Sequence, residues 1–330
     1  MNLVLRFVYF GIWSCLLFEA EACDICGNYM CITPYDNKSS ISFLHRYRVF
    51  NGYRNYQETS RFFPHSAYRV QHGDSHGDSL LAGNRTYSSN DFESYKVFEC
   101  RFKYFITQRL ELNVFIPLQN NKSKTNNILN RHTGLGDISL NTGFHFITPK
   151  ADEFFRHKLI VGVGMKLPTG NHFAHDQNGN RLPFEMQPGS GSLDGFGYVN
   201  YMFVANNLGA NISVNYKVNG SNNYHEKLKN SHNHYVSVFY KIKHKELIVY
   251  PSLQANYEYT KGLAIHFRLL NNTQVNSLLL GPGLDVYYKS FSFNTSWQFT
   301  AFETVRDGNL KSVGRISFGI NYNITKKESN

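Results

Sequence analysis

The sequence lacks several features that would point to common protein classes. Its longest apolar run, from Phe7 to Phe18, covers about 12 residues, and a membrane-crossing helix requires about 20. It has only five cysteines, and none lies in a C-x-x-C-H motif, which excludes attachment of a c-type haem. Its glycine-rich stretches lead into no G-K-[ST], which excludes a nucleotide phosphate loop.

The charge and the aromatic content bear on the binding partner and on the fold class. Lys and Arg total 34 against 24 Asp and Glu, but this excess is dispersed and forms no basic arm. We therefore expect no nucleic-acid partner. Aromatic residues make up 15% of the chain, with 27 Phe and 22 Tyr, and the mean hydropathy is −0.40. An aromatic-rich but moderately polar composition favours a β-barrel of the outer-membrane type.

The first residues have the organisation of a secretory signal. Arg6 precedes the apolar run, and Ala20-Glu21-Ala22 has the small-x-small pattern of a cleavage site. We predict a cleaved signal peptide over residues 1–22. This predicts export, and with the composition it indicates the outer membrane of a Gram-negative-type cell.

The stretch CDICGNYMC follows the expected cleavage site and opens a predicted periplasmic segment, residues 23–39. Paired cysteines in an exported chain tend to form disulfides, so Cys23, Cys26 and Cys31 are disulfide candidates. With Met30 they would also suit a soft metal such as Cu(I). A redox pair and a lipid anchor on Cys23 remain further alternatives.

Most of the chain has a period of two. In FSFNTSWQFTAF, residues 291–302, Phe, Trp and Ala side chains alternate with Ser, Asn, Gln and Thr. Such a segment is a strand with one apolar and one polar face. Several segments are roughly 10 to 14 residues long, as membrane strands require, and aromatic residues gather near their ends, as in interfacial girdles.

The pattern predicts an all-β fold, a transmembrane antiparallel up-and-down β-barrel of about 12 strands, over residues 40–324 with a polar tail at 325–330. Short turns alternate with long polar loops, as in outer-membrane barrels. An even count places both ends of the barrel at the short-turn, periplasmic side. The expected strands are 40–50, 92–106, 107–118, 134–148, 156–167, 192–205, 207–218, 233–243, 245–258, 277–288, 290–303 and 311–324, with 262–270 as a possible addition.

Three stretches resemble a known family. They are GLGDISLNTGFHF (134–146), KLIVGVGMKLPTGN (158–171) and QPGSGSLDGFGYVNYMF (187–203). Their order and spacing are similar to those of the outer-membrane transporters named after the meta-pathway of phenol degradation, over about residues 92 to 324. The resemblance implies a β-barrel that takes up small, often aromatic or hydrophobic compounds. The CDICGNYMC opening and the 51–91 loop depart from the family pattern.

Charged side chains on the predicted inner face are candidates for lining the lumen. Both signs are present, so we expect no strong selectivity for anions or cations, and the groups could also pair with one another. The candidates are Arg46, Arg48, Glu99, Arg101, Lys103, Glu111, Asp137, His145, Lys166, Glu258 and Asp285.

Histidine clusters in the expected outer loops are candidates for weak metal binding. Imidazole and carboxylate groups bind zinc or copper. The clusters contain His72 and His76 in QHGDSHGDS and His172 and His175 in HFAHD. Apart from such a metal ion, we expect no cofactor.

We therefore expect a channel or transporter for a small solute, passive or gated, rather than an enzyme. Its partners would be outer-membrane lipid, the solute and the barrel-assembly machinery. A metal-binding or structural surface protein is the alternative. A lipid hydrolase is a remote one, since His145 and Ser139 lie about 20 Å apart along one extended strand, too far for a hydrogen bond.

Overall fold

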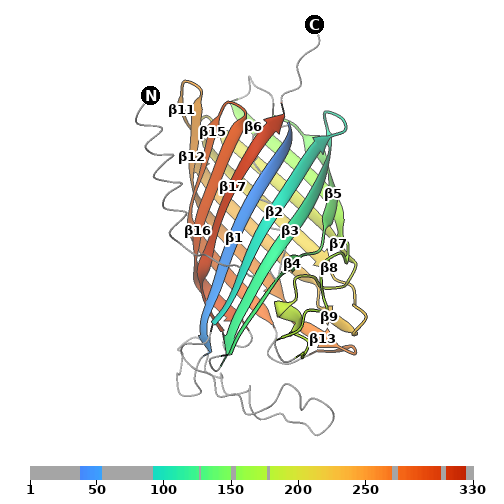
Figure 1. The fold of residues 1–330 in the computed structure, drawn as a ribbon. Coiled ribbons are helices and arrows are strands. Elements are labelled where there is room, and N and C mark those ends of the chain that lie inside the picture. Colours follow the sequence, from blue (N-terminus) through green and yellow to red (C-terminus); the bar gives the residue numbers. More distant parts are fainter. Residues whose placement is uncertain are drawn as a thin grey trace.

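The computed structural model describes residues 38–53, 92–125, 128–149, 154–176, 179–269, 274–305 and 310–324. Twelve long strands form a closed antiparallel barrel (Figure 1). They are β1 (Ser39–Tyr53), β2 (Phe92–Phe105), β3 (Leu110–Thr125), β5 (Ser139–Ile147), β6 (Phe155–Lys166), β7 (Asp194–Ala205), β8 (Leu208–Val218), β10 (Ser231–Tyr240), β12 (Leu247–Thr260), β15 (Val275–Tyr288), β16 (Phe291–Val305) and β17 (Leu310–Ile324).

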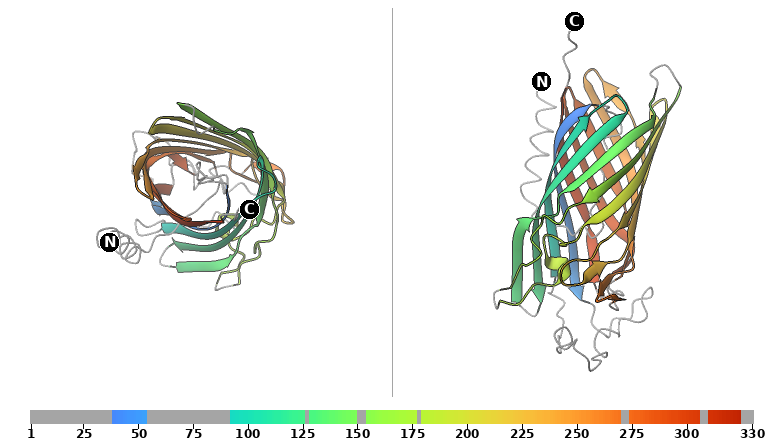
Figure 2. Two further views of the ribbon diagram at one scale, coloured as in Figure 1. Left: turned by 90° about the horizontal axis from the view of Figure 1, so that it is seen from above. Right: turned by 90° about the vertical axis from the view of Figure 1, so that its right-hand side faces the viewer.

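The sheet closes on itself without a free edge along this path. Each strand pairs with its sequence neighbours, and β1 pairs with β17 from Ser39↔Ile324 to Tyr53↔Leu310. The view along the axis shows the strands surrounding one lumen (Figure 2). Closure satisfies the backbone N–H and C=O groups of every strand, which a lipid environment requires. The predicted fold class and strand number are confirmed.

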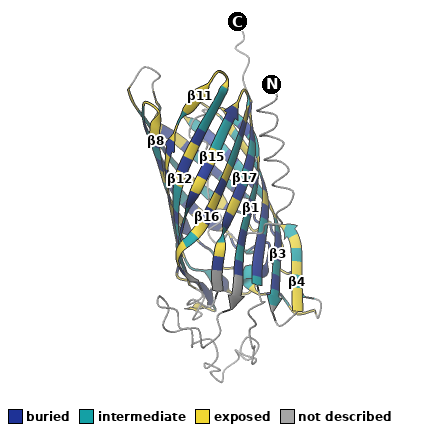
Figure 3. Ribbon diagram, turned by 90° about the vertical axis from the view of Figure 1, so that its left-hand side faces the viewer, coloured by how far each residue is buried: buried dark blue, intermediate teal, exposed yellow. Residues whose placement is uncertain are grey.

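Side chains alternate between the two faces of the wall, as the period of two predicts. Trp297 and Phe299 are exposed on the outer face of β16, whereas Ser296 and Gln298 are buried on its inner face. The same alternation of buried and exposed positions follows the other strands (Figure 3). The barrel is therefore apolar outside and polar inside.

The two ends of the barrel differ in their connections. Short turns join β2 to β3, β7 to β8 and β15 to β16, and the ends of β1 and β17 near Ser39 and Ile324 lie at this same end (Figure 1). The connections after β6, β8 and β12 are long and lie at the opposite end. Among the residues that the structure describes, no helix has the length and apolar character needed to cross a membrane.

Two local features differ from the sequence-based expectation. The expected strand 134–148 is divided into β4 (Ile128–Leu135) and β5, because the Gly136 N–H turns to the Pro117 carbonyl at 2.8 Å. β4 lies off the closed path and pairs with β3, so the stretch expected as a loop is largely a hairpin that extends from the barrel (Figure 3).

The possible extra strand at 262–270 is not part of the barrel wall. It forms β13 (Leu263–Ile265) and β14 (Arg268–Leu269), which join β9 (Glu226–Leu228) in a small sheet at the long-loop end. The remaining short elements are β11 (Ile242–His244) and a 3₁₀ turn, η2 (Phe184–Met186).

Candidate functional site

The three glycine motifs meet at one point inside the barrel. Gly136 precedes β5, Gly170 follows β6, and Gly189 precedes β7. A Cβ atom on Gly170 would lie 2.7 Å from backbone atoms of both Gly136 and Gly189. Glycine is required here because only a residue without a side chain lets three backbone segments approach this closely.

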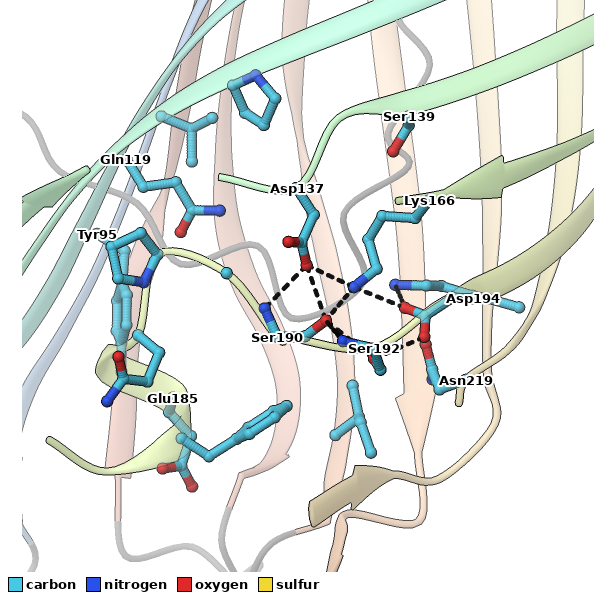
Figure 4. Close-up of a pocket in the computed structure, with 18 of the residues that line it drawn as sticks. Tyr95, Gln119, Asp137, Ser139, Lys166, Glu185, Ser190, Ser192, Asp194 and Asn219 are labelled. Carbon is cyan, nitrogen blue, oxygen red and sulfur yellow. Dashed lines mark hydrogen bonds and ion pairs between the residues drawn. The ribbon is translucent and has the colours of Figure 1, made fainter. Parts of the chain in front are cut away.

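Asp137 holds these segments together through hydrogen bonds. Its Oδ1 accepts the Gly170 N–H at 2.9 Å, and its Oδ2 accepts the Ser190 N–H at 2.8 Å and the Ser190 hydroxyl at 2.7 Å. Lys166 Nζ donates to the same Oδ2 at 2.6 Å and also to the Ser190 hydroxyl. We call Asp137, Lys166, Gly170 and Ser190 the Asp137 junction, and Figure 4 shows Asp137, Lys166 and Ser190 of it.

A second carboxylate extends this network along the wall. Asp194 Oδ2 lies 2.8 Å from Lys166 Nζ and 3.1 Å from Lys217 Nζ. Its Oδ1 accepts the Ser192 hydroxyl at 2.8 Å and the Gly220 N–H at 2.9 Å. Charges of both signs therefore alternate around the mouth of the lumen, each with a partner of opposite charge.

The described parts of the connection between β6 and β7, residues 167–176 and 179–193, reach the inner faces of β1, β2 and β15, and we call them the lumen loop. Ala174, Leu182 and Met186 of the loop pack in one apolar cluster with side chains from the inner faces of β1, β2 and β15. Gln187 reinforces the loop by accepting the Ala174 N–H at 2.8 Å and donating to the Leu182 carbonyl at 2.8 Å. The loop therefore has its own packed interior against the barrel wall.

A bidentate ion pair joins the lumen loop to the next long connection. The two Arg181 amino groups lie 2.7 and 2.8 Å from the two carboxylate oxygens of Glu226 in β9. The Arg181 guanidinium also lies over the Tyr224 ring at 3.9 Å from its centroid. Bidentate pairing and stacking on a ring are geometries that arginine supports and lysine does not.

A cavity of about 160 Å³ lies between the lumen loop and the inner wall. Its apolar lining includes Tyr95, Phe115 and Pro188, and its polar lining includes Asp137, Lys166 and Glu185 (Figure 4). For comparison, an apolar cavity of about 150 Å³ accommodates benzene. The space fits a molecule of roughly one ring with a polar substituent.

Buried ion pairs cross the lumen near this cavity. Glu258 of β12 accepts from Arg48 of β1 and from Arg315 of β17, each at 2.5 Å. Gln298 accepts two further hydrogen bonds from Arg315, at 2.6 and 3.1 Å. The three charged groups come from strands far apart in the sequence and are at most 3% exposed.

A second cluster of charged side chains lies on β1 and β2. Glu99 accepts from Arg46 at 3.1 Å and from Arg101 on its own strand. The Lys103 ammonium lies 5.8 Å from the Phe105 ring centroid and borders a smaller cavity of about 70 Å³ toward the short-turn end.

His145 is fully buried on the inner face of β5. Its Nε2 lies 2.9 Å from Glu111 Oε2, and its Nδ1 has no hydrogen-bond partner among the described residues. A hydrolase would need a hydroxyl within hydrogen-bond reach of this imidazole. The described surroundings provide a Phe105 ring at 5.3 Å between centroids instead, so the geometry gives the hydrolase alternative no support.

The remaining candidates are placed as follows. Asp285 lies on the inner face of β15 near the short-turn end. His172 packs its ring against Phe173 and Tyr224, and His175 pairs with Arg181 in an isolated bridge. In the part of the chain that the structure describes, no group of three or more His, Cys, Asp or Glu could hold a metal ion. Cys23, Cys26, Cys31, His72 and His76 lie outside the described residues.

Sequence reasoning missed several residues of the site. Ser190, Asp194 and Lys217 were not candidates, although the Q-P-G-S-G stretch and the expected strand 192–205 were both noted. Three glycine-rich turns at the same end of neighbouring strands were the available signal that they meet in space.

Comparison with a solved outer-membrane channel agrees with the fold. No protein-family model matches this chain, and no curated protein matches it in sequence. The COG4313 outer membrane channel from Pseudomonas putida F1 is similar in structure, with a TM-score of 0.60 and 11% identity over 93% of this chain and 98% of that chain. The transport unit of the autotransporter AIDA-I from Escherichia coli matches with a TM-score of 0.48 and 10% identity, over 89% and 93%.

Together these findings define the class of protein. The chain is a closed twelve-stranded β-barrel of the outer-membrane type, with an apolar outer face. Inside the barrel, paired charges and the anchored lumen loop surround a small cavity.

Proposed function

We propose that the protein is an outer-membrane channel through which a small solute crosses, by passive or gated diffusion, into the periplasm of a Gram-negative-type cell. The observation that carries this proposal is a closed barrel with a polar, charged inner face and a cavity beneath an anchored loop. Charged groups that line the lumen of a barrel tune which solutes pass through it. The barrel-assembly machinery would insert the chain, and outer-membrane lipid would surround it.

The cavity suggests the kind of solute. Rings and a proline on one side and ionised groups on the other would bind a small molecule that has an apolar body and a polar group. This agrees with the resemblance to the meta-pathway transporters, whose expected solutes are small and often aromatic. Because the charges of the lumen occur as pairs, such as Arg48 with Glu258 and Lys166 with Asp137, we expect weak selectivity for ionic charge.

Passage requires the lumen loop to move. The loop covers the cavity, and both the Asp137 junction and the Arg181–Glu226 pair hold it against the wall. We therefore propose a gate whose closed state these contacts stabilise. Breaking one contact should raise the population of the open state without altering the wall.

Conductance across planar lipid bilayers tests the proposal. The Arg181→Gln variant removes the ion pair to Glu226, so we expect a larger single-channel conductance or longer openings than in the unmodified protein. Arg268→Gln is the matched control, because Arg268 is exposed in β14 and its replacement should leave conductance unchanged. If neither the unmodified protein nor Arg181→Gln conducts ions although both are folded, a channel function is contradicted.

A further inference from the structure

The turn between β7 and β8 lies between two basic residues at the short-turn end of the barrel. On the side of β6, Arg156 donates from Nη2 to the Asn206 carbonyl at 3.1 Å. On the side of β10, the Lys241 N–H donates to the Asn207 carbonyl at 2.6 Å. The two carbonyls belong to consecutive residues, whose Cα atoms are about 3.8 Å apart. This turn therefore holds the Arg156 guanidinium and the backbone of Lys241 close to each other.

Lys243 adds a third cation to this part of the rim. It lies in β11, two residues after Lys241, and is exposed. Burial and the charges of Arg156 and Lys243 lower the pKa of Lys241 from its usual value, so the three cations lie close enough to repel one another. Among the described residues, no carboxylate forms an ion pair with any of the three, whereas Lys289 at the same end has Glu246 at 3.6 Å. Cations held together in this way attract an anion that can pair with all of them.

The outer wall beside Arg156 carries a belt of aromatic side chains on β6 and β7, which we call the ring belt. Phe155 and Phe203 stack with ring centroids 5.7 Å apart and planes at 21°. The His157 ring lies 5.2 Å from the Phe203 ring between centroids, and its Nδ1 lies 2.7 Å from the Tyr201 hydroxyl. All four alternate along their strands with buried inner-face residues, so they lie on the lipid-facing side. Rings of this kind gather at the level of the lipid headgroups, so the three cations lie near that level too.

The combination of cations with an adjoining apolar surface selects the type of anion. Guanidinium and ammonium groups bind phosphate oxygens, and basic clusters at a membrane face recognise anionic lipids. A phospholipid also has acyl chains that would cover exposed rings, which a soluble anion lacks. We propose that Arg156, Lys241 and Lys243 bind the headgroup of an anionic phospholipid whose acyl chains lie against the ring belt. The site rests on the proposed function only for its assignment to the periplasmic leaflet of the outer membrane.

Native mass spectrometry of the full-length folded protein in a neutral detergent tests the site without any need for conductance. The probes are dioleoyl phosphatidylglycerol, which is anionic, and dioleoyl phosphatidylcholine, which has the same chains and phosphate but no net charge. At equal concentrations, one phosphatidylglycerol should bind to each barrel in preference to phosphatidylcholine. Arg156→Gln and Lys241→Gln should each weaken phosphatidylglycerol binding by about fivefold, and the double variant by about 25-fold.

Two control variants remove the same types of charge elsewhere at the short-turn end. Arg109→Gln changes an exposed arginine in the turn between β2 and β3, and Lys289→Gln changes the lysine that pairs with Glu246. Both should bind phosphatidylglycerol like the unmodified protein. Folding of each variant is checked by its heat-modifiable migration, and Lys241→Gln alone decides the result if Arg156→Gln does not fold.

The outcomes separate this inference from the channel proposal. Equal binding of the two lipids overturns the site, as does an unchanged affinity in the folded variants or an equal loss in the two controls. Inorganic phosphate in large excess should leave phosphatidylglycerol bound, and its complete displacement would indicate a site for free phosphate and overturn the lipid assignment. Phosphatidylglycerol binding that depends on Arg156 and Lys241 in a protein without conductance would support the site and contradict the channel.

Discussion

Replacing Asp137 by asparagine should release the lumen loop. The Asp137 carboxylate accepts four hydrogen bonds, from Gly170, from Lys166 and two from Ser190. An amide keeps one oxygen acceptor but presents an NH₂ group to the remaining donors. Lys166 retains Asp194 at 2.8 Å, so its charge stays paired. Hydrogen bonds to charged groups contribute about 1.5–3 kcal/mol each and do not add fully, so we expect the closed state to lose about 2–4 kcal/mol.

Limited proteolysis measures this change. Arg181 in the lumen loop is a trypsin site, and its ion pair with Glu226 keeps it bound in the closed state. Cleavage of a transiently opened segment follows the population of the open form when opening is fast. A loss of about 2–4 kcal/mol corresponds to roughly 30- to 1000-fold faster cleavage. Mass spectrometry identifies the cut at Arg181 among those at other loops.

A second loop variant provides the control. Asp176 accepts the Asn180 N–H at 2.8 Å within the lumen loop, so Asp176→Asn removes a carboxylate from the loop but not from the Asp137 junction. Its cleavage at Arg181 should change far less. If Asp137→Asn is cleaved less than about three times faster than the unmodified protein, the junction does not hold the loop closed.

Three further substitutions test other parts of the structure. Gly170→Ala forces a Cβ against two backbone segments and should release the loop in the same trypsin assay; unchanged cleavage would contradict the close packing. Glu258→Gln removes the buried carboxylate that Arg48 and Arg315 share and should lower the free energy of unfolding by about 3–5 kcal/mol in urea titrations. Leu253→Arg places a charge on the outer face, where Leu253 is 72% exposed. At the bilayer midplane this charge should make the free energy of folding into the membrane less favourable by about 2–4 kcal/mol. Equilibrium folding into lipid vesicles measures this free energy, and an unchanged value would argue against a lipid-facing position.

The wall of the barrel could be predicted because its pattern is local. In β16 and β17 most of the apolar residues recur at alternate positions, and a strand turns alternate side chains to opposite faces whatever its neighbours are. The alternation of short turns and long loops then indicated the direction of the strands. The closed twelve-stranded sheet confirms this part of the prediction.

The break in the expected strand 134–148 was not predictable in the same way. In LGDISL, Leu135 is out of phase with Ile138 and Leu140, so the period of two shifts here but does not show what interrupts the strand. The interruption depends on contacts with Pro117 and with the lumen loop, which lies more than 30 residues further along the chain. A local pattern contains no information on such a contact.

What the sequence by itself determined is the two-sided character of each strand and therefore a barrel that is apolar outside and polar inside. Only the tertiary structure decided which inner charges pair, since Arg48 and Glu258 are 210 positions apart, and that three glycine motifs meet around Asp137. The reason is physical: the face of a strand follows from neighbouring residues, whereas ion pairs and loop contacts depend on which distant strands the closed sheet brings together.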